Sequence, residues 1–325
     1  MKIGLDPAPA ALRGTYFQHL ASVLARYAPE HEYIIGAEVN DGVDLYHGFR
    51  SSLPLSVHLR RVPSVMTVQN LNFLRYPHLY TLFVLTLYRR ALRRAGRVIT
   101  VSAPAREELS ERLNIDPSKI EVMVPLAVPA PHGNPSQAEL EHVRRKYALP
   151  EHFILMIGTV ESRHNHQAVF AALADVASPA GVVVCGRRTA WSDYLLGYAR
   201  ARRIAARVDF IYELTPSDLP ALFRLARVFA YLPDADAEAS VVPVVEALRA
   251  GLPMVLSDTQ VNREAAGEAA AYVRPEARGE VLAALENALE DVSWRRTMQE
   301  RERRRAELFS EYAVAERLMQ IYTSL

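Results

Sequence analysis

The sequence predicts an α/β protein made of two doubly wound parallel sheets. Short apolar runs that suit buried strands alternate with longer segments of helical periodicity along most of the chain. The alternation is interrupted once, in a Pro-rich stretch near the middle, and then starts again. The chain has 325 residues, of which 50% are hydrophobic, and this is more than one core usually supports. Two successive domains are therefore expected.

In the first half, six apolar runs are expected to be strands: Lys2–Leu5, Tyr33–Ile35, Val43–Tyr46, Ser64–Val68, Arg97–Val101 and Ile120–Val124. Helical segments lie between them. The helical spacing of apolar residues predicts one buried helix face, formed by Tyr16, Phe17, Leu20, Val23, Leu24 and Tyr27. Two further helices are expected over Leu79–Ala95 and Pro104–Leu113.

The stretch Val124–Ser136, with its prolines and a Gly-Asn pair, is expected to be a linker. After it, six more strands are expected: Phe153–Ile157, Gly181–Cys185, Val208–Ile211, Val228–Tyr231, Pro253–Leu256 and Ala271–Val273. The helices expected between them are Gln167–Ala177, Ser192–Ala205, Pro216–Ala226, Val242–Ala250 and Gly279–Leu289.

The composition excludes several classes of protein. The formal net charge is +1, which gives no global basic excess for binding nucleic acid. Cys185 is the only cysteine, so no disulfide can form within the chain, which fits a reducing compartment. No signal-peptide apolar run follows Lys2, and the apolar run Leu79–Leu87 is too short to span a membrane. We therefore expect a soluble, cytoplasmic protein that can still lie on a membrane surface.

Two glutamates, Glu238 and Glu246, are eight positions apart, at the junction between the strand Arg227–Tyr231 and a helix that is expected to begin near Val242. The first lies in the loop, and the second lies about one turn inside the helix. A helix N-terminus offers unpaired N–H groups and positive partial charge that suit a phosphate, and the flanking carboxylates suit sugar and ribose hydroxyls. On spacing alone, a purely structural role at the protein surface fits these glutamates equally well.

This segment, Leu232–Asp258, resembles the Glu-x7-Glu motif of the retaining glycosyltransferases of family 4, which have the two-domain GT-B fold. Further segments resemble parts of that family in the same order: Val65–Tyr80, Ile99–Leu113 with Ile120–Met123, Ile157–Asn165 and Leu256–Gly267. The resemblance implies an acceptor-side domain over residues 1–130 and a nucleotide-sugar-binding domain over residues 131–305. A final helix over residues 306–325 is expected to cross back onto the first domain.

The resemblance also implies roles for individual residues. Glu238 corresponds to the glutamate that faces the donor sugar and stabilises positive charge as its bond to phosphate breaks, and Glu246 corresponds to the one that binds ribose hydroxyls. Arg163 corresponds to a basic residue that neutralises the leaving diphosphate, and Gln69 to a histidine near the reacting sugar. Further binding contacts are expected from Gly14, Gly158, His164, Arg187, Ser240, Val241 and Val242.

Several positions depart from the family pattern. The loop after the first glutamate usually reads Gly-Phe-Gly, whereas this chain has Ala239, Ser240 and Val241. His164 stands where a lysine is usual, and a neutral imidazole clamps a diphosphate less strongly than an ammonium group. Arg187, just after an expected strand, can supply the missing charge, and an ordinary surface arginine fits this position equally well. These changes leave the expected fold unchanged but bear on donor choice and rate.

The implied reaction transfers a sugar, with retention, from a GDP- or UDP-linked donor to a glycan or a lipid-linked glycan. The segment Val65–Tyr80 favours mannose transfer from GDP. No metal or other cofactor is expected, because the sequence has neither HExxH nor a Cys pair, and the family holds the diphosphate with basic residues and a helix terminus. Two alternatives stay open: a nucleotide-sugar epimerase on the same fold, and a non-catalytic partner that binds a nucleotide or a sugar.

The helix Tyr80–Gly96 ends in a cluster of cations formed by Arg89, Arg90, Arg93, Arg94 and Arg97. In one interpretation the helix is buried and its basic end is solvated. In the other, this patch on the first domain contacts anionic lipid or a lipid-diphosphate acceptor, peripherally, on the inner face of the membrane. A second basic segment, Trp294–Phe309, is expected to be a solvated helix face, and Tyr312–Thr323 a final packed helix.

Overall fold

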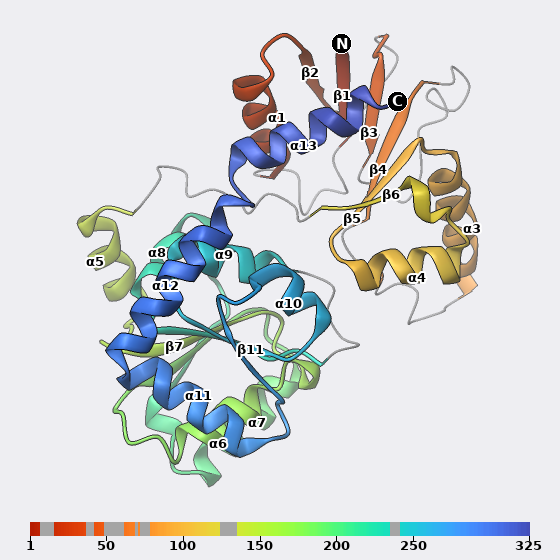
Figure 1. Cartoon of the computed structure of the whole chain (residues 1–325). Coiled ribbons are helices and arrows are strands. Elements are labelled where there is room, and N and C mark those ends of the chain that lie inside the picture. The colour runs from red at the N-terminus through yellow and green to blue at the C-terminus, as the bar shows by residue number, and fades with distance from the viewer. Residues whose placement is uncertain are drawn as a thin grey trace. The chain divides into compact units, whose positions relative to one another are not determined.

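The computed structural model describes residues 1–6, 16–36, 42–48, 62–68, 71, 79–123, 135–234 and 241–325 (Figure 1). The chain divides into two compact units. The first is formed mainly by Met1–Val128 with Leu308–Leu325, and the second by Pro129–Glu238 with Pro243–Glu307. Each unit is built around its own parallel sheet, as the sequence predicts.

The first unit contains a six-stranded sheet in the order β2-β1-β3-β4-β5-β6, all of whose pairings are parallel. Its strands are β1 (Lys2–Asp6), β2 (Glu32–Ile35), β3 (Leu45–Gly48), β4 (Ser64–Val68), β5 (Arg97–Thr100) and β6 (Ile120–Val122). Its helices are α1 (Tyr16–Tyr27), α3 (Leu79–Arg94), α4 (Ala103–Leu113) and α13 (Glu311–Thr323). Strand β3 begins two residues later than expected, at Leu45, and Val43 is buried beside Gly4 before the pairing starts.

Helix α13 comes from the far end of the chain and packs against α1 in this first unit (Figure 1). It contributes Val314, Leu318 and Ile321 to a core that also contains Leu20 and Leu24 of α1. Leu20, Val23 and Leu24 of the predicted apolar face are therefore confirmed as buried, whereas the side chains of Tyr16 and Phe17 lie outside the described part of the structure. Tyr27 is the exception: its side chain is 41% exposed and lies edge-on against the ring of Tyr312.

A buried hydrogen-bonded group ties α13 to the first sheet. The His47 ring of β3 bonds the Tyr322 hydroxyl through Nδ1 and the Thr67 hydroxyl through Nε2, each at 2.7 Å. Burial lowers the pKa of His47 to about 3, so the ring is neutral at physiological pH. The final helix is thus anchored by a specific polar contact as well as by apolar packing.

The second unit contains a six-stranded parallel sheet in the order β12-β11-β10-β7-β8-β9. Its strands are β7 (Phe153–Ile157), β8 (Gly181–Cys185), β9 (Val208–Ile211), β10 (Val228–Tyr231), β11 (Met254–Ser257) and β12 (Ala271–Val273). Its helices are α5 (Gln137–Lys146), α6 (His166–Leu173), α7 (Ala190–Ala201), α8 (Leu219–Leu225), α9 (Val242–Ala250), α10 (Gln260–Ala266), α11 (Arg278–Glu290) and α12 (Val292–Glu307).

Two of these helices, α5 and α10, were not expected from the sequence. In α5 only Val143 is buried, so the segment lacks the apolar stripe that reveals a helix. Its start is fixed instead by a capping box in which Ser136 and Glu139 each bond the other's backbone N–H. Helix α6 is also shorter than predicted and ends at Leu173.

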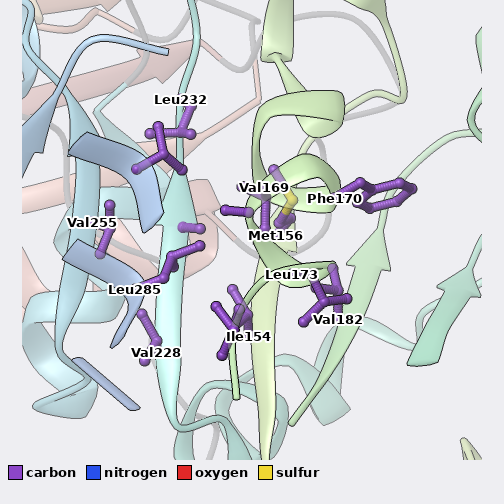
Figure 2. Close-up of a cluster of buried hydrophobic side chains, with 14 of the residues drawn as sticks. Ile154, Met156, Val169, Phe170, Leu173, Val182, Val228, Leu232, Val255 and Leu285 are labelled. Carbon is purple, nitrogen blue, oxygen red and sulfur yellow. The ribbon is translucent and has the colours of Figure 1, made fainter. Parts of the chain in front are cut away.

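The core of the second unit lies between its sheet and the covering helices, as Figure 2 shows. Ile154 and Met156 of β7 and Val182 of β8 meet Val169 and Phe170 of α6 there, and all five are at most 2% exposed. Complete burial of such side chains contributes roughly 1.5–3 kcal/mol each. This packing fixes the ends of β7 and β8, from which the loops of the candidate functional site extend.

Helix α12 carries the basic segment that was expected to be a solvated face. Arg296, Arg303 and Arg304 are indeed exposed, but Arg295 and Glu302 are buried, so the expectation is only partly correct. Arg295 donates to the carbonyls of Ala288 and Leu289 at the end of α11, which explains its burial. Across the parts of the chain that the structure describes, no helix is long and apolar enough to cross a membrane.

Candidate functional site

The loops that follow β7 and β8 are joined by backbone hydrogen bonds. The N–H of Gly158 donates to the Cys185 carbonyl at 3.0 Å, and the N–H of Val160 donates to the Arg187 carbonyl at 3.1 Å. A Cβ atom on Gly186 would lie 1.7 Å from the carbonyl oxygen of Gly158, so only glycine allows this close approach. The two loops therefore form one surface at the carboxyl ends of the strands, where doubly wound sheets bind ligands.

Gly158 also needs to be a glycine. Its φ is +143°, and a Cβ at this position would come within 2.9 Å of Nδ1 of His164. The His164 side chain is only 5% exposed, and its ring centroid lies 6.4 Å from that of Tyr231. His164 is thus packed beneath the loop, next to the backbone of Gly158.

Glu161 lies between two of the cations of this surface. Nε of Arg163 donates to Oε2 of Glu161 at 2.6 Å, and a terminal nitrogen of Arg187 lies 3.8 Å from Oε1. The neighbouring Arg188 is engaged elsewhere, because it donates to Asp193 at 2.8 Å and lies over the ring of Tyr212. The side chain of Arg187 is 76% exposed, so this arginine can meet a ligand from solution.

The backbone of Glu161 is held from the first turn of α6. The buried His166 ring makes a hydrogen bond to the backbone of Glu161, and the N–H of His164 donates to the Glu161 carbonyl at 3.2 Å. Burial, followed by the nearby His164, lowers the pKa of His166 to about 4. His166 is therefore a neutral, structural group at physiological pH.

The loop after β10 is hydrogen-bonded to the loop that follows β7. Asn165, whose φ is +51°, donates from Nδ2 to the Leu232 carbonyl at 2.9 Å and to Oδ1 of Asp234 at 2.6 Å. The N–H of Asp234 in turn donates to the Arg163 carbonyl at 2.8 Å. The chain thus enters the segment 235–240, which carries Glu238, beside Arg163.

Four of the predicted site residues, Gly14, Gln69, Glu238 and Ser240, lie outside the described residues. Of the predicted site residues that follow Ser240, Val241 is buried and Val242 is the first residue of α9. Glu246 is half-buried in the second turn of that helix. The helix therefore begins where the sequence predicts, directly after the segment with the first glutamate.

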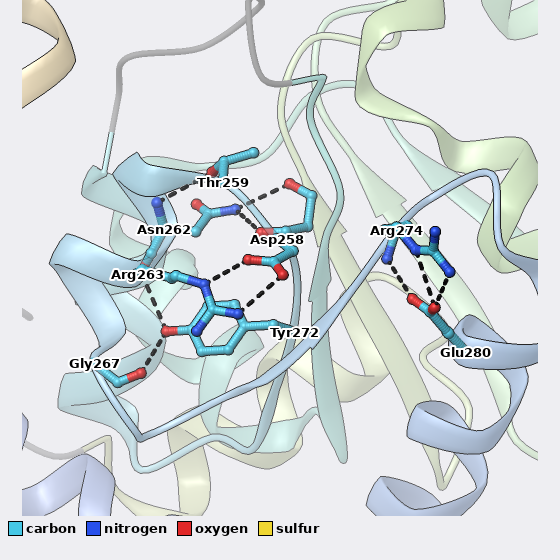
Figure 3. A network of polar contacts seen from close by, with 9 residues as sticks. Asp258, Thr259, Asn262, Arg263, Gly267, Tyr272, Arg274 and Glu280 are labelled. Atoms are coloured by element: carbon cyan, nitrogen blue, oxygen red, sulfur yellow. Dashed lines mark hydrogen bonds and ion pairs between the residues drawn. The ribbon is translucent and has the colours of Figure 1, made fainter.

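The stretch after β11 is braced by polar contacts, which Figure 3 shows. Thr259 caps α10 by accepting from the Asn262 N–H, and Asn262 donates to the Ser257 carbonyl at 2.9 Å. Arg263 makes two bonds to Asp258 and lies 4.4 Å from the ring centroid of Tyr272. These bonds hold the loop between β11 and α10 rigidly.

Within the described ranges, no group of three His, Cys, Asp or Glu side chains is arranged to hold a metal ion. The charged groups that converge on the loop surface are instead Arg163, Arg187 and Glu161. Two guanidinium groups near one carboxylate can bind a diphosphate through charge-assisted hydrogen bonds.

Sequence reasoning missed Gly186, Glu161, Asn165 and Asp234. Gly186 had a signal, because a glycine directly after a buried strand often marks a close backbone approach. Glu161 lies within Ile157–Asn165, a segment that resembles the family. Its pairing with Arg163, however, depends on the turn that brings side chains two positions apart into contact. Asn165 and Asp234 are far apart in sequence, and nothing local links them.

Two curated relatives match parts of the chain. The O-antigen chain mannosyltransferase B of Escherichia coli is 28% identical over 222 residues, which are 66% of this chain and 57% of that protein. The O-antigen chain mannosyltransferase RfbU of Salmonella typhimurium is 23% identical over 228 residues, which are 68% of this chain and 60% of that protein. The chain thus spans less than two thirds of the length of either relative.

A similar fold is found in the crystal structure of Anabaena HepE in complex with UDP, with a TM-score of 0.76 and 13% identity over the whole of both chains. This similarity confirms the predicted two-domain GT-B fold. The family model described as glycosyltransferase family 4 matches residues 11–125. The model described as glycosyl transferases group 1 matches residues 139–305, which is more than half of the chain. The chain therefore belongs to the group 1 glycosyl transferases.

Proposed function

We propose that this chain is a hexosyltransferase that moves a sugar from a nucleotide-diphosphate sugar with retention of anomeric configuration. The observation that carries the proposal is the convergence of Arg163 and Arg187 at the carboxyl ends of β7 and β8. Such a pair of guanidinium groups suits a diphosphate. Membership of the family and the names of the two relatives support the same class of reaction.

In the proposed reaction, the bond between C1 of the sugar and the phosphate oxygen breaks, and its electron pair stays on the diphosphate. Arg163 and Arg187 stabilise this charge. Glu238 stabilises the positive charge at C1. Gln69 forms a hydrogen bond to the sugar, and Glu246 binds the ribose hydroxyls. The oxygen of an acceptor hydroxyl forms a bond to C1 on the same face that the leaving group occupied. The hydroxyl proton passes to the leaving phosphate oxygen.

The remaining candidates have backbone or supporting roles in this proposal. Gly14 and Gly158 let the chain approach the donor closely, and the start of α9, with Ser240, Val241 and Val242, offers N–H groups to the diphosphate. His164, which is buried beneath Gly158, supports that loop from below. No metal is required, because arginines and a helix terminus supply the positive charge.

For the donor we propose GDP-mannose, because both curated relatives are named mannosyltransferases. The structure of HepE holds UDP, which makes UDP-glucose the donor to compare. The proposed acceptor is a glycan or a lipid-linked glycan, used in polysaccharide synthesis on the cytoplasmic side of the membrane. Exposed Arg90 of α3 is a candidate for lipid contact, whereas Arg89 and Arg93 donate to carbonyl groups of the chain itself.

The experiment measures release of GDP or UDP from GDP-mannose and UDP-glucose, with and without lipid-linked acceptors. Arg163→Ala is expected to lower kcat/KM about 100-fold, as loss of a group that stabilises transition-state charge does. Glu280→Gln, which alters an exposed Glu–Arg pair elsewhere in the second unit, should leave turnover unchanged. If the chain binds a nucleotide sugar and turns none over with any acceptor, the proposed activity is wrong.

That outcome would favour a non-catalytic binding partner. The burial of His164, where the family usually has a lysine, is the observation that favours this second candidate. An isothermal titration with GDP and UDP, combined with the turnover assay, separates the two, because a binding partner would bind a nucleotide with no turnover in the wild-type protein.

A further inference from the structure

Glu161 is an acidic residue at the place where the proposed function requires positive charge. Its two carboxylate oxygens are directed at different cations, Oε2 at Nε of Arg163 and Oε1 at a terminal nitrogen of Arg187. The side chain is about one-third exposed, so it lies at the edge of the loop surface, where a ligand can reach it. The carboxylate therefore bridges the arginines of the two loops.

The position of this carboxylate is fixed by the fold. His166 bonds the Glu161 backbone, the His164 N–H donates to its carbonyl, and the next loop is joined through the bond from Val160 to the Arg187 carbonyl. These contacts hold the backbones of Glu161 and Arg187 next to each other, independently of the attraction between the two side chains. An incidental ion pair on a surface would lack this support.

The three side chains together carry a formal charge of +1. A diphosphate bound by Arg163 and Arg187 would come close to the Glu161 carboxylate, and this like-charge contact opposes binding. The bond to Nε of Arg163 also competes with the ligand for that guanidinium group. Both effects lower affinity for the nucleoside diphosphate while keeping the arginines in place.

We propose that Glu161 is a positioning residue that holds Arg163 and Arg187 together in the donor-free protein and promotes release of the nucleoside diphosphate product. This inference rests on the proposed function. It assigns to Glu161 an effect on the lifetime of the product complex, apart from any effect on bond breaking at the sugar.

The test is the affinity for GDP and UDP, measured by isothermal titration in Glu161→Gln and Glu161→Asp. Glutamine keeps an acceptor for Nε of Arg163 and removes the charge, so the Kd of the nucleotide that the wild type binds is expected to fall about 10-fold, which is about 1.4 kcal/mol. The dissociation rate should fall with it. Aspartate keeps the charge, so its Kd should stay near the wild-type value. The matched control is Glu280→Gln, which neutralises a carboxylate paired with Arg274 away from these loops.

A double-mutant cycle tests whether the effect passes through Arg187. In an Arg187→Gln background, removing the Glu161 charge should tighten binding much less than in the wild type. An unchanged or raised Kd in Glu161→Gln, with normal binding by the wild type, overturns this inference alone. If the wild type binds neither nucleotide nor nucleotide sugar, the proposed function fails and this inference fails with it.

Discussion

The carboxyl group of Glu302 lies in the interior of the second unit, on α12, and is 0% exposed. Neither of its oxygens has a hydrogen-bond partner among the described residues, and burial raises its pKa to about 8. Because the folded-state pKa lies above the ordinary value of 4.5, the folded protein holds a proton that the unfolded chain has released. The contribution of Glu302 to stability is therefore highest at low pH and falls as the pH rises from about 4.5 to about 8.

The size of this loss follows from linkage. Each pH unit within that window costs about 1.4 kcal/mol, so the second unit is expected to lose about 2 kcal/mol between pH 6.5 and pH 8. Glu302→Gln carries no titrating group, so this loss should disappear. At pH 8 the variant is expected to be more stable than the wild type, even though a buried amide is also costly.

Urea unfolding followed by tryptophan fluorescence measures this difference. Both tryptophans, Trp191 and Trp294, lie in the second unit, and Trp294 is on α12 itself, so the signal reports on the relevant part. Glu300→Gln is the matched control: it lies on the same helix but pairs with Arg304 at the surface, and it should keep the wild-type pH dependence. If Glu302→Gln loses as much stability as the wild type between pH 6.5 and pH 8, Glu302 is ionised in the folded protein and the reasoning fails.

Four further substitutions test other parts of the structure. Gly186→Ala should weaken nucleotide binding at least about 10-fold and lower Tm, because the added Cβ meets the neighbouring loop. Gly197→Ala, at an open helical position, should instead stabilise the protein by roughly 0.5–1 kcal/mol in a thermal-shift assay. Arg207→Met removes donors from three backbone carbonyls and should cost about 2–4 kcal/mol in urea unfolding. Tyr322→Phe removes the bond to His47 and should speed amide hydrogen exchange in α13, at a cost of about 1 kcal/mol.

The fold could be predicted from the sequence because the central strands of both sheets, such as β4, β8 and β10, are buried on both faces. All twelve expected strands are present, and eleven of them begin within one residue of the expected position and end within two of it. Helices were predictable where a stripe of apolar residues marks the buried side. Helix α5 has no such stripe, and the burial of Glu302 runs against the charged character of its neighbours, so neither could be found from local pattern.

The candidate site was only partly predictable. The resemblance identified Arg163, and the position of Arg187 just after a strand gave a reason to single it out. Their common partner Glu161 depends on bonds between two loops that join residues 27 positions apart, which residue types alone do not reveal. Gly186 is different, because its position directly after a buried strand is a signal in the sequence, although the group that it approaches, the Gly158 carbonyl, is seen only in the structure.

The histidine at position 164 shows how the structure changes the interpretation of a departure from the family pattern. On sequence, His164 is a weaker cation in a diphosphate clamp. In the structure its side chain is buried against Gly158 and near Tyr231, so the identity of residue 164 acts first on the shape of the loop after β7. A lysine there would have to leave this packed position or lose its charge, since an unpaired buried ammonium group is costly. The positive charge of the loop surface therefore depends on Arg163 and Arg187, and the carboxylate of Glu161 sets how much of that charge a ligand meets.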